Sequence, residues 1–143
     1  MPAAVRVDPY KNFNFKVEIA GVTSAGFYEV NGLESEVAVI EYREGGDFAT
    51  RKLPGLAKFG NITLKRGVTD SLELYQWHKK ILQGVMDRRD GVITLLDDAK
   101  KPVRRWKFSN AFPFKYEGPA LNATSSDVAI ETLVLCCEGL DLE

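Results

Sequence analysis

Cysteine is scarce in this sequence, and long hydrophobic runs are absent. The only two cysteines, Cys136 and Cys137, are neighbours in the chain, so they cannot join distant segments as the disulfides of a small secreted scaffold do. We expect both thiols to be reduced and structural. The longest apolar stretch, Leu133 to Cys137, is far too short to span a membrane, and the N-terminus lacks the basic start and apolar run of a secretion signal. The sequence therefore predicts a protein that is made and folded in the cytoplasm.

Neither sign of charge is in excess. The 19 Lys and Arg residues and the 20 Asp and Glu residues give a net charge of -1, which supplies no overall electrostatic reason to bind nucleic acid or an anionic membrane. The chain has 143 residues, of which 45% are apolar and 27% are charged. This size and composition predict one ordinary globular domain over residues 1–143, with residues 1–9 as an N-terminal extension.

Residues suited to catalysis or metal binding are also few. The only histidine, His78, falls in the middle of a predicted helix, and no nucleophile and base can be assembled around it. The segment Gly55–Gly60 has the glycine spacing of a phosphate-binding loop, but Asn61 and Ile62 stand where Lys and Ser or Thr are needed. The cysteine pair is expected to point to opposite faces of a strand, which prevents both thiols from binding one metal ion. We therefore predict no enzyme activity, no metal and no cofactor.

Alternating apolar and polar residues predict strands along most of the chain, because side chains of a half-buried strand alternate between core and solvent. The expected strands cover residues 13–19, 27–33, 37–42, 61–65, 92–96, 103–108 and 128–137. One helix is expected from Asp70 to Gly84, with Asp70 and Glu73 as its capping pair and an apolar stripe of Leu74, Trp77, Ile81, Leu82 and Val85. We predict a mainly β (α+β) fold, a small antiparallel barrel or sandwich of about seven strands with one flanking helix and a long extended loop.

Two segments stand out as candidates for contact with other molecules. Residues 43–60 carry five glycines or prolines and no clear periodicity, and loops of this length usually have a function. The expected last strand is apolar on both faces over Leu133, Val134, Leu135, Cys136 and Cys137. Its second face must be covered either by the helix or by a neighbouring copy of the protein, so we treat it as a possible interface strand.

From Asp8 to its end the sequence resembles the tail tube proteins of contractile phages and the inner tube proteins of phage-tail-like injection particles. The matching stretches are Asp8–Val17, Val30–Glu34, Glu41–Asp47, Arg51–Leu56, Ile62–Gly67, Leu74–Trp77 and Lys115–Ala123. Each is short, but their order and spacing together are specific.

The resemblance implies a β-barrel with one helix, similar to the haemolysin-coregulated protein of type VI secretion, assembled as stacked six-membered rings. Its implied partners are copies of itself, a contractile sheath protein, baseplate and spike proteins, tube-terminating proteins, and DNA or protein cargo in the lumen. Assembly in the bacterial cytoplasm would then give a phage tail or a released injection particle. A compact chain of this size is ~37 Å across, and a ring of six such bodies encloses a pore of similar width.

On this reading, the segment 43–60 is an inter-subunit loop that docks on an adjacent copy. Its own apolar residues are too few to offset the entropy of ordering it within one subunit. The residues assigned to it are Arg43, Glu44, Gly45, Gly46, Asp47, Phe48, Arg51, Lys52, Leu53, Pro54, Gly55, Leu56 and Phe59. The alternative from another functional class is a monomeric small-ligand-binding β-barrel, in which inward-pointing residues line a pocket.

Overall fold

A computed structural model describes residues 8–22 and 26–143, and it contains nine strands and one helix within them. The elements are β1 (Phe15–Ile19), β2 (Phe27–Asn31), β3 (Ser35–Tyr42), β4 (Arg51–Phe59), β5 (Ile62–Gly67), α1 (Glu73–Leu82), β6 (Arg89–Leu96), β7 (Pro102–Glu117), β8 (Ile130–Cys136) and β9 (Gly139–Leu142). Most of the predicted N-terminal extension, residues 1–7, lies outside the described residues. No helix in the described part of the chain is long and apolar enough to cross a membrane.

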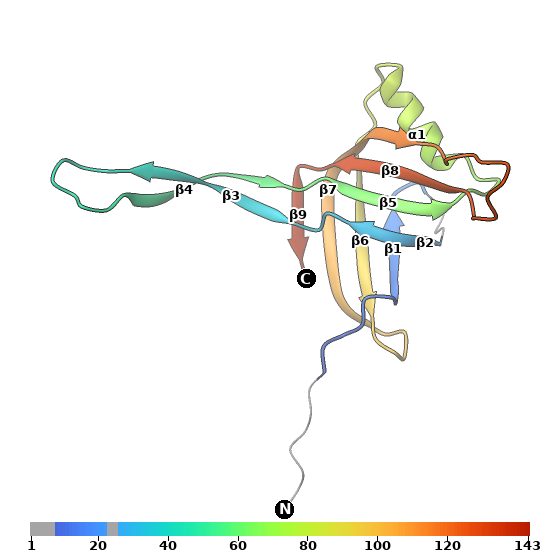
Figure 1. Cartoon of the computed structure of the whole chain (residues 1–143), viewed down its shortest axis with the longest axis horizontal. Helices are drawn as coiled ribbons and strands as arrows, with labels where there is room; N and C mark the ends of the chain where they lie inside the picture. Colours follow the sequence, from blue (N-terminus) through green and yellow to red (C-terminus); the bar gives the residue numbers. More distant parts are fainter. Residues whose placement is uncertain (1–7, 23–25) are drawn as a thin grey trace, which may run out of the picture.

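The body of the protein is a strongly bent antiparallel sheet of seven strands. Its order is β1-β6-β7-β8-β5-β2, and β9 pairs with β7. Figure 1 shows that β1, β6 and the first half of β7 run across the direction of β8, β5 and β2, so the two halves of the sheet cross steeply. This arrangement confirms the prediction of a mainly β fold of the barrel or sandwich type.

Strand β7 joins the two halves because it belongs to both. Its first part pairs with β6 and β9, whereas the part from Phe112 to Glu117 pairs with β8. Between these parts, Asn110 has a φ of 52°, in the left-handed region that asparagine tolerates better than most residues. Its backbone amide donates to the Asp90 carboxylate at 2.9 Å. Strands that change sheets at such a bend form the corners of orthogonal sheet packings.

The hydrophobic core fills the space between the two halves of the sheet. Its fully buried members are Val17, Ile19, Ile62, Leu64, Leu74, Trp77, Ile93, Phe108, Ala111, Leu133 and Leu135. Gly91 on β6 permits a close contact with this core, because a Cβ at this position would overlap the Phe108 ring. The absence of a side chain at Gly91 therefore lets the aromatic ring pack directly on the backbone of β6.

Helix α1 exists where predicted, but its start differs from the sequence prediction. It runs over Glu73–Leu82, its N-cap residue Leu72 makes no side-chain cap hydrogen bond, and the Glu73 amide donates only a long bond to the Ser71 hydroxyl at 3.5 Å. The predicted capping pair of Asp70 and Glu73 is therefore wrong. The helix is held instead by tertiary packing, which normally outweighs capping in short helices.

One face of α1 closes the core. Leu74, Trp77 and His78 are buried, whereas Leu82 and the following Val85 are exposed, so the predicted apolar stripe is correct only for its first half. The Trp77 indole Nε1 donates to the Asp87 carbonyl at 2.7 Å. These contacts anchor both the helix and the turn after it to the sheet.

Candidate functional site

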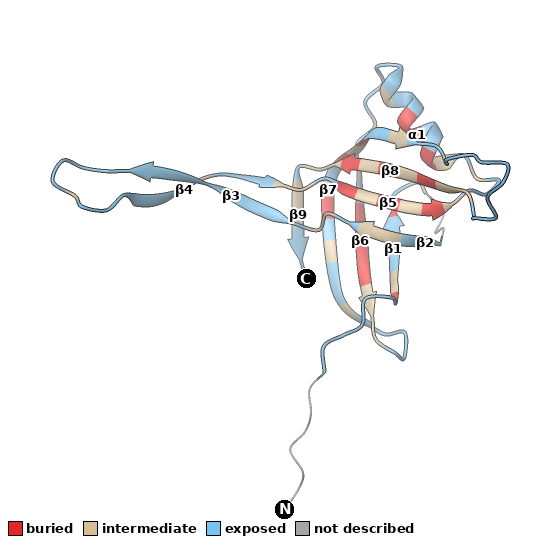
Figure 2. Cartoon of the chain, in the orientation of Figure 1, coloured by how far each residue is buried: buried red, intermediate tan, exposed pale blue. Residues whose placement is uncertain are grey.

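A two-stranded ribbon projects from the body and is the most conspicuous feature of the surface. We call it the arm: it consists of β3, β4 and the turn between them, residues 35–59. Figures 1 and 2 show it extending away from the seven-stranded sheet with almost every residue exposed. The arm carries large exposed apolar side chains, namely Val37, Val39, Ile40, Tyr42, Phe48, Leu53 and Leu56. Such a ribbon is at best marginally stable in water without a partner surface.

The arm corrects the prediction of an unpatterned loop over residues 43–60. Arg51–Phe59 is a strand, paired with β3 from Ser35 opposite Phe59 to Tyr42 opposite Arg51. Only the turn around Gly45 and Gly46 remains a loop. Pro54 is tolerated because β4 pairs on one side only, so its missing N–H removes no bond from a second ladder. Between the Val37 and Val39 pairs the register shifts, and this bulge takes up the Pro54-Gly55 interruption.

The tip of the arm is ordered by contacts within itself. The Asp47 carboxylate accepts a hydrogen bond from the Glu44 backbone amide at 3.1 Å and pairs with the Arg51 guanidinium at 3.4 Å. The Tyr42 hydroxyl donates to the Glu44 carboxylate at 3.0 Å. Phe48 is fully exposed at the end of this turn. A turn that is hydrogen-bonded within itself thus presents an aromatic side chain at the tip of the arm.

The possible interface strand over residues 133–137 is corrected in part. Leu133 and Leu135 are 0% exposed and belong to the core, so neither is available to a neighbouring copy. Val134, Cys136 and Cys137 are half-buried. The strand is therefore covered within the chain on the leucine face, and an interface role is left only to the opposite face.

The two cysteines lie against different segments of the chain, one against β7 and the other against the link between β4 and β5. The Cys136 thiol points to the Phe112 carbonyl at 3.8 Å, and the Cys137 thiol points to the Gly60 carbonyl at 3.9 Å. Both are free, and burial raises the pKa of both thiols, which lowers the fraction of reactive thiolate.

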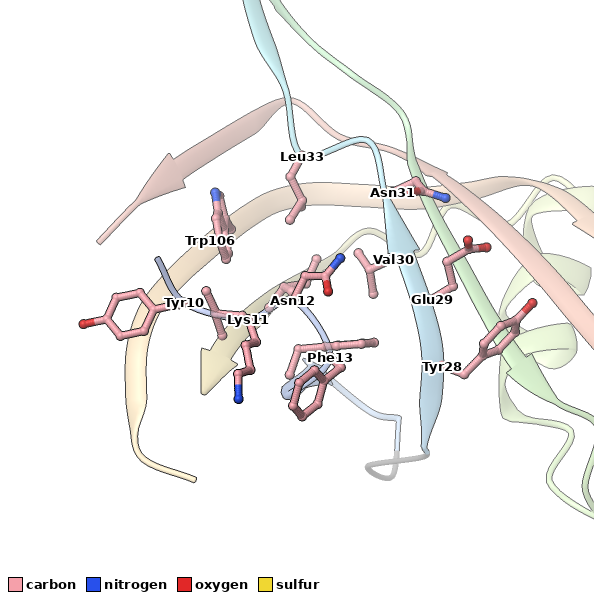
Figure 3. A pocket seen from close by; sticks show the side chains of 13 residues that line it. Tyr10, Lys11, Asn12, Phe13, Tyr28, Glu29, Val30, Asn31, Leu33 and Trp106 are labelled. Carbon is pink, nitrogen blue, oxygen red and sulfur yellow. The ribbon is translucent and has the colours of Figure 1, made fainter. Parts of the chain in front are cut away.

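A cleft of about 530 Å³ opens between the N-terminal segment, β2 and the inner face of β6 and β7. Figure 3 shows Val30 and Trp106 on opposite sides of this cleft, with Leu33 at its upper end and Phe13 at its lower end. Its walls are mainly apolar and aromatic. The cleft lies where the outer strands β1 and β2 do not pair with each other.

A buried ion pair joins the neighbouring strands β5 and β8, and the sequence reasoning did not identify it. The Arg66 Nε donates to the Glu131 carboxylate at 2.6 Å, and the Tyr116 hydroxyl donates to the other carboxylate oxygen at 2.8 Å. Arg66 is only 2% exposed and its Nη1 has no hydrogen-bond partner. The alternation of side chains along β5 could have predicted the burial of Arg66, because Arg66 lies on the same face of the strand as Ile62 and Leu64.

The ion pair also affects the tyrosine that completes it. Burial, followed by the hydrogen bond to Glu131, raises the pKa of Tyr116 to about 12. The Tyr116 ring packs edge-on against Tyr75 of α1 with centroids 5.3 Å apart. His78 lies nearby, and its Nδ1 donates to the Pro113 carbonyl at 2.9 Å, which gives this histidine a structural role. In the described ranges no three His, Cys, Asp or Glu side chains are grouped so as to hold a metal ion.

The bent sheet, the flanking helix and the projecting arm define a class of small β-barrel proteins with an extended two-stranded appendage. The family described as T4-like virus tail tube protein gp19 matches residues 11–141. A comparison with curated protein sequences finds no match. The chain belongs to the T4-like tail tube protein family, which is a family of structural proteins.

Solved structures with similar chains include two contractile particles. A chain in the PVC sheath-tube complex of an extracellular contractile injection system, in its extended state, is 31% identical with a TM-score of 0.86, and the match covers 94% of this chain and 91% of that one. A chain in the six-fold symmetrised baseplate of the anti-feeding prophage is 26% identical with a TM-score of 0.87, covering 96% and 97%. Hcp1 from Flavobacterium johnsoniae, at 18% identity, shares the fold with a TM-score of 0.61 over 91% and 94% of the two chains.

Proposed function

We propose that this chain is the structural subunit of the hollow inner tube of a contractile tail or injection particle. Its copies form six-membered rings that stack inside a contractile sheath, and the tube conveys DNA or protein cargo through a target envelope. The observation that carries the proposal is the exposed arm on a tail-tube body. An apolar ribbon with no cover of its own needs a partner surface.

The relatives support the partners in this proposal. One similar chain occurs in a complex of sheath and tube, and another occurs in a six-fold symmetrised baseplate. We transfer both relationships to this chain, so that its tube lies inside a sheath and begins at a baseplate. A cap or terminator closes the other end, as the related particles suggest. Assembly takes place in the bacterial cytoplasm, and the finished particle is a phage tail or is released.

The shape of the subunit favours stacking over a closed dimer. The arm leaves the body on one side, and its surface differs from the surface of the seven-stranded sheet. Contact between two unlike surfaces is heterologous, and such contacts repeat from copy to copy to give rings or filaments. Treated as a compact sphere without the arm, the body is ~35 Å across, and a ring of six touching bodies has a pore of about the same width, enough for a DNA duplex or a small folded protein.

Electron microscopy of the purified protein tests the proposal. We expect hollow tubes or annuli with six-fold class averages. A uniform population of monomers or two-fold dimers at all protein concentrations, including in the presence of sheath and baseplate proteins, contradicts it.

A deletion tests whether the arm is responsible. Ser35 and Phe59 are direct cross-strand partners, so a short Gly-Ser linker can replace residues 36–58 without moving the body. We expect a protein that is folded by circular dichroism but no longer polymerises. Tubes at normal yield contradict the role of the arm, and an unfolded product means that the segment belongs to the core.

The alternative of a monomeric ligand-binding barrel rests on the cleft shown in Figure 3. This alternative predicts that light scattering shows a monomer at all concentrations. It does not explain why the arm exposes large apolar side chains.

A further inference from the structure

The corner of β7 is a β-bulge in the pairing between β6 and β7. The register shifts between the pairs made by Arg89 and Gly91. Two residues of β7, Ser109 and Asn110, therefore lie opposite Asp90 alone. A bulge of this kind bends its strand and leaves the extra residue without a partner in the ladder. The bend between the two halves of the sheet (Figure 1) thus falls where backbone pairing is interrupted.

Side chains from the facing segment take both backbone polar groups of Asn110. Its amide donates to the Asp90 carboxylate at 2.9 Å, and its carbonyl accepts a hydrogen bond from the Arg88 guanidinium at 3.3 Å. Arg88 lies just before β6 and two positions before Asp90, and in an extended chain such residues point to the same side. These two side chains therefore stand in for the ladder bonds that the bulge lacks.

Arg88 also reaches the link between β8 and β9. Its guanidinium pairs with the Glu138 carboxylate at 2.9 Å and lies over the Phe112 ring, 5.2 Å from the ring centroid. The Glu138 amide donates to the Ser109 carbonyl at 3.0 Å. The chain crosses from one half of the sheet to the other within β7, before β6, and between β8 and β9. Arg88 lies in one of these crossings and contacts the other two.

We propose that Arg88, Asp90 and Glu138 form a clasp that fixes the angle at which the two halves of the sheet cross. We call these three side chains the corner clasp. The Arg88 and Glu138 side chains are 38% and 58% exposed, and an isolated pair of this exposure contributes little to stability. The planar guanidinium of Arg88 contacts a carboxylate, a carbonyl and a ring at once, so it restrains three segments relative to one another. The clasp therefore acts on the orientation of the halves more than on the free energy of unfolding.

The crossing angle has a consequence for assembly, and this consequence rests on the proposed function. The arm follows β2 and leads into β5 in one half of the sheet, whereas β1, β6 and β9 belong to the other half. A change of the angle turns the surfaces of one half relative to those of the other. A ring closes only when each copy is rotated by the same fixed amount from the last. Rocking at the corner therefore gives open arcs or irregular rings.

Residual dipolar couplings of the backbone amides measure the relative orientation of the two halves. The sample is the full-length chain, at concentrations where light scattering shows monomers. One alignment tensor should fit both halves of the wild type, and we expect Arg88→Ala to lose this agreement, so that each half needs its own tensor. Lys107→Ala is the matched control, because it removes an exposed ion pair, 2.6 Å long, to Glu143 within one half of the sheet. It should keep the single tensor.

Two variants of Asp90 test the other side of the clasp. Asp90→Ala removes the acceptor of the Asn110 amide and should also separate the tensors. Asp90→Asn keeps an oxygen acceptor at this position and should retain the single tensor. A single tensor in either alanine variant, Arg88→Ala or Asp90→Ala, overturns the proposal.

Hydrogen exchange separates positioning from a general loss of stability. We expect the Glu138 amide, which bonds across the corner, to exchange at least tenfold faster in Arg88→Ala than in the wild type. The amides of Leu64 in β5 and Ile93 in β6 should change less than threefold, because each lies within one half of the sheet. Equal acceleration at all three amides, or loss of the folded state in circular dichroism, shows that Arg88 supports the whole fold and overturns the positioning role.

Electron microscopy of the assembled protein tests the consequence for the ring. Arg88→Ala should give at least tenfold fewer closed rings than the wild type, whereas Lys107→Ala should change the yield less than threefold. Normal rings from an Arg88→Ala chain whose halves need separate tensors overturn this consequence. The absence of rings in the wild type overturns the proposed function, while the monomer measurements still decide whether the clasp fixes the crossing angle.

Discussion

Replacing Glu131 by Gln should destabilise the body strongly, because it leaves the Arg66 charge buried and unpaired. In the native chain the Glu131 carboxylate neutralises Arg66 and also accepts the Tyr116 hydroxyl. Arg66 has few other partners: its Nη2 donates to the Ser71 carbonyl at 3.3 Å, and its Nη1 has none. Breaking a buried pair from one side costs about 3–5 kcal/mol. That is a large fraction of the ~5–15 kcal/mol that separates folded from unfolded domains.

Urea denaturation followed by circular dichroism measures this effect, at protein concentrations where light scattering shows monomers. Each kcal/mol of lost unfolding free energy lowers Tm by ~2–4 °C in a chain of this size, so the loss expected for Glu131→Gln corresponds to a fall in Tm of about 10 °C. The double variant Arg66→Met, Glu131→Leu is the matched control, because it removes both charges and keeps an apolar volume. We expect its stability to lie much closer to that of the wild type than Glu131→Gln does, with a remaining loss of about 1 kcal/mol because the Tyr116 hydroxyl loses its acceptor.

Two results would refute the reasoning. A loss below about 1 kcal/mol in Glu131→Gln means that the Arg66 charge is solvated in spite of its burial. A double variant that is as unstable as the single variant means that shape, and not charge pairing, explains the loss.

Three further predictions concern single positions. Tyr116 should ionise near pH 12, which the absorbance of tyrosinate at 295 nm measures. The variant Tyr116→Phe should lack the part of the absorbance change that belongs to this residue. If the difference between wild type and variant titrates near pH 10, the hydroxyl is not buried. Because the folded pKa lies above the unfolded value of about 10, the stability from this group is complete below pH 10 and is lost as the pH rises toward 12. Gly91→Ala should lower the free energy of unfolding by about 1–3 kcal/mol in urea denaturation, because the added Cβ would overlap Phe108. Gly118 has open space around it, so Gly118→Ala should show no comparable loss of stability. Equal losses at both sites contradict the packing argument. Replacing both Cys136 and Cys137 by Ser should leave tube assembly unchanged, and neither wild type nor variant should be sensitive to oxidants. If an oxidant blocks assembly of the wild type but not of the variant, the cysteines act as a redox switch.

The strands that the sequence predicted well are those with one face in the core. Buried residues alternate with exposed ones at the end of β1 and with half-buried ones along β5, and this alternation is readable from residue type alone. Strand β4 was missed because Pro54 and Gly55 interrupt its pattern and because neither face of the arm is buried within the chain. Burial then imposes no alternation on its residues.

Long-range pairing accounts for the other differences. β7 continues past its predicted end at Phe108 because the bend near Asn110 redirects the strand to β8 without ending it. β9 has four residues, which is too short for a periodic signal. The burial of Leu133 depends on packing between distant segments that no local pattern reveals.

The pairing of β5 with β8 also decides the order in which the chain can fold during synthesis. Arg66 and Glu131 are 65 positions apart, so the pair of β2 and β5 lacks its neighbour β8 until nearly the whole chain has left the ribosome. The two strands of the arm are close in sequence and are synthesised early, but an isolated two-stranded ribbon is not stable in water. A nascent chain therefore has no finished body on which another subunit can dock, and the growth of the proposed tube is confined to completed chains.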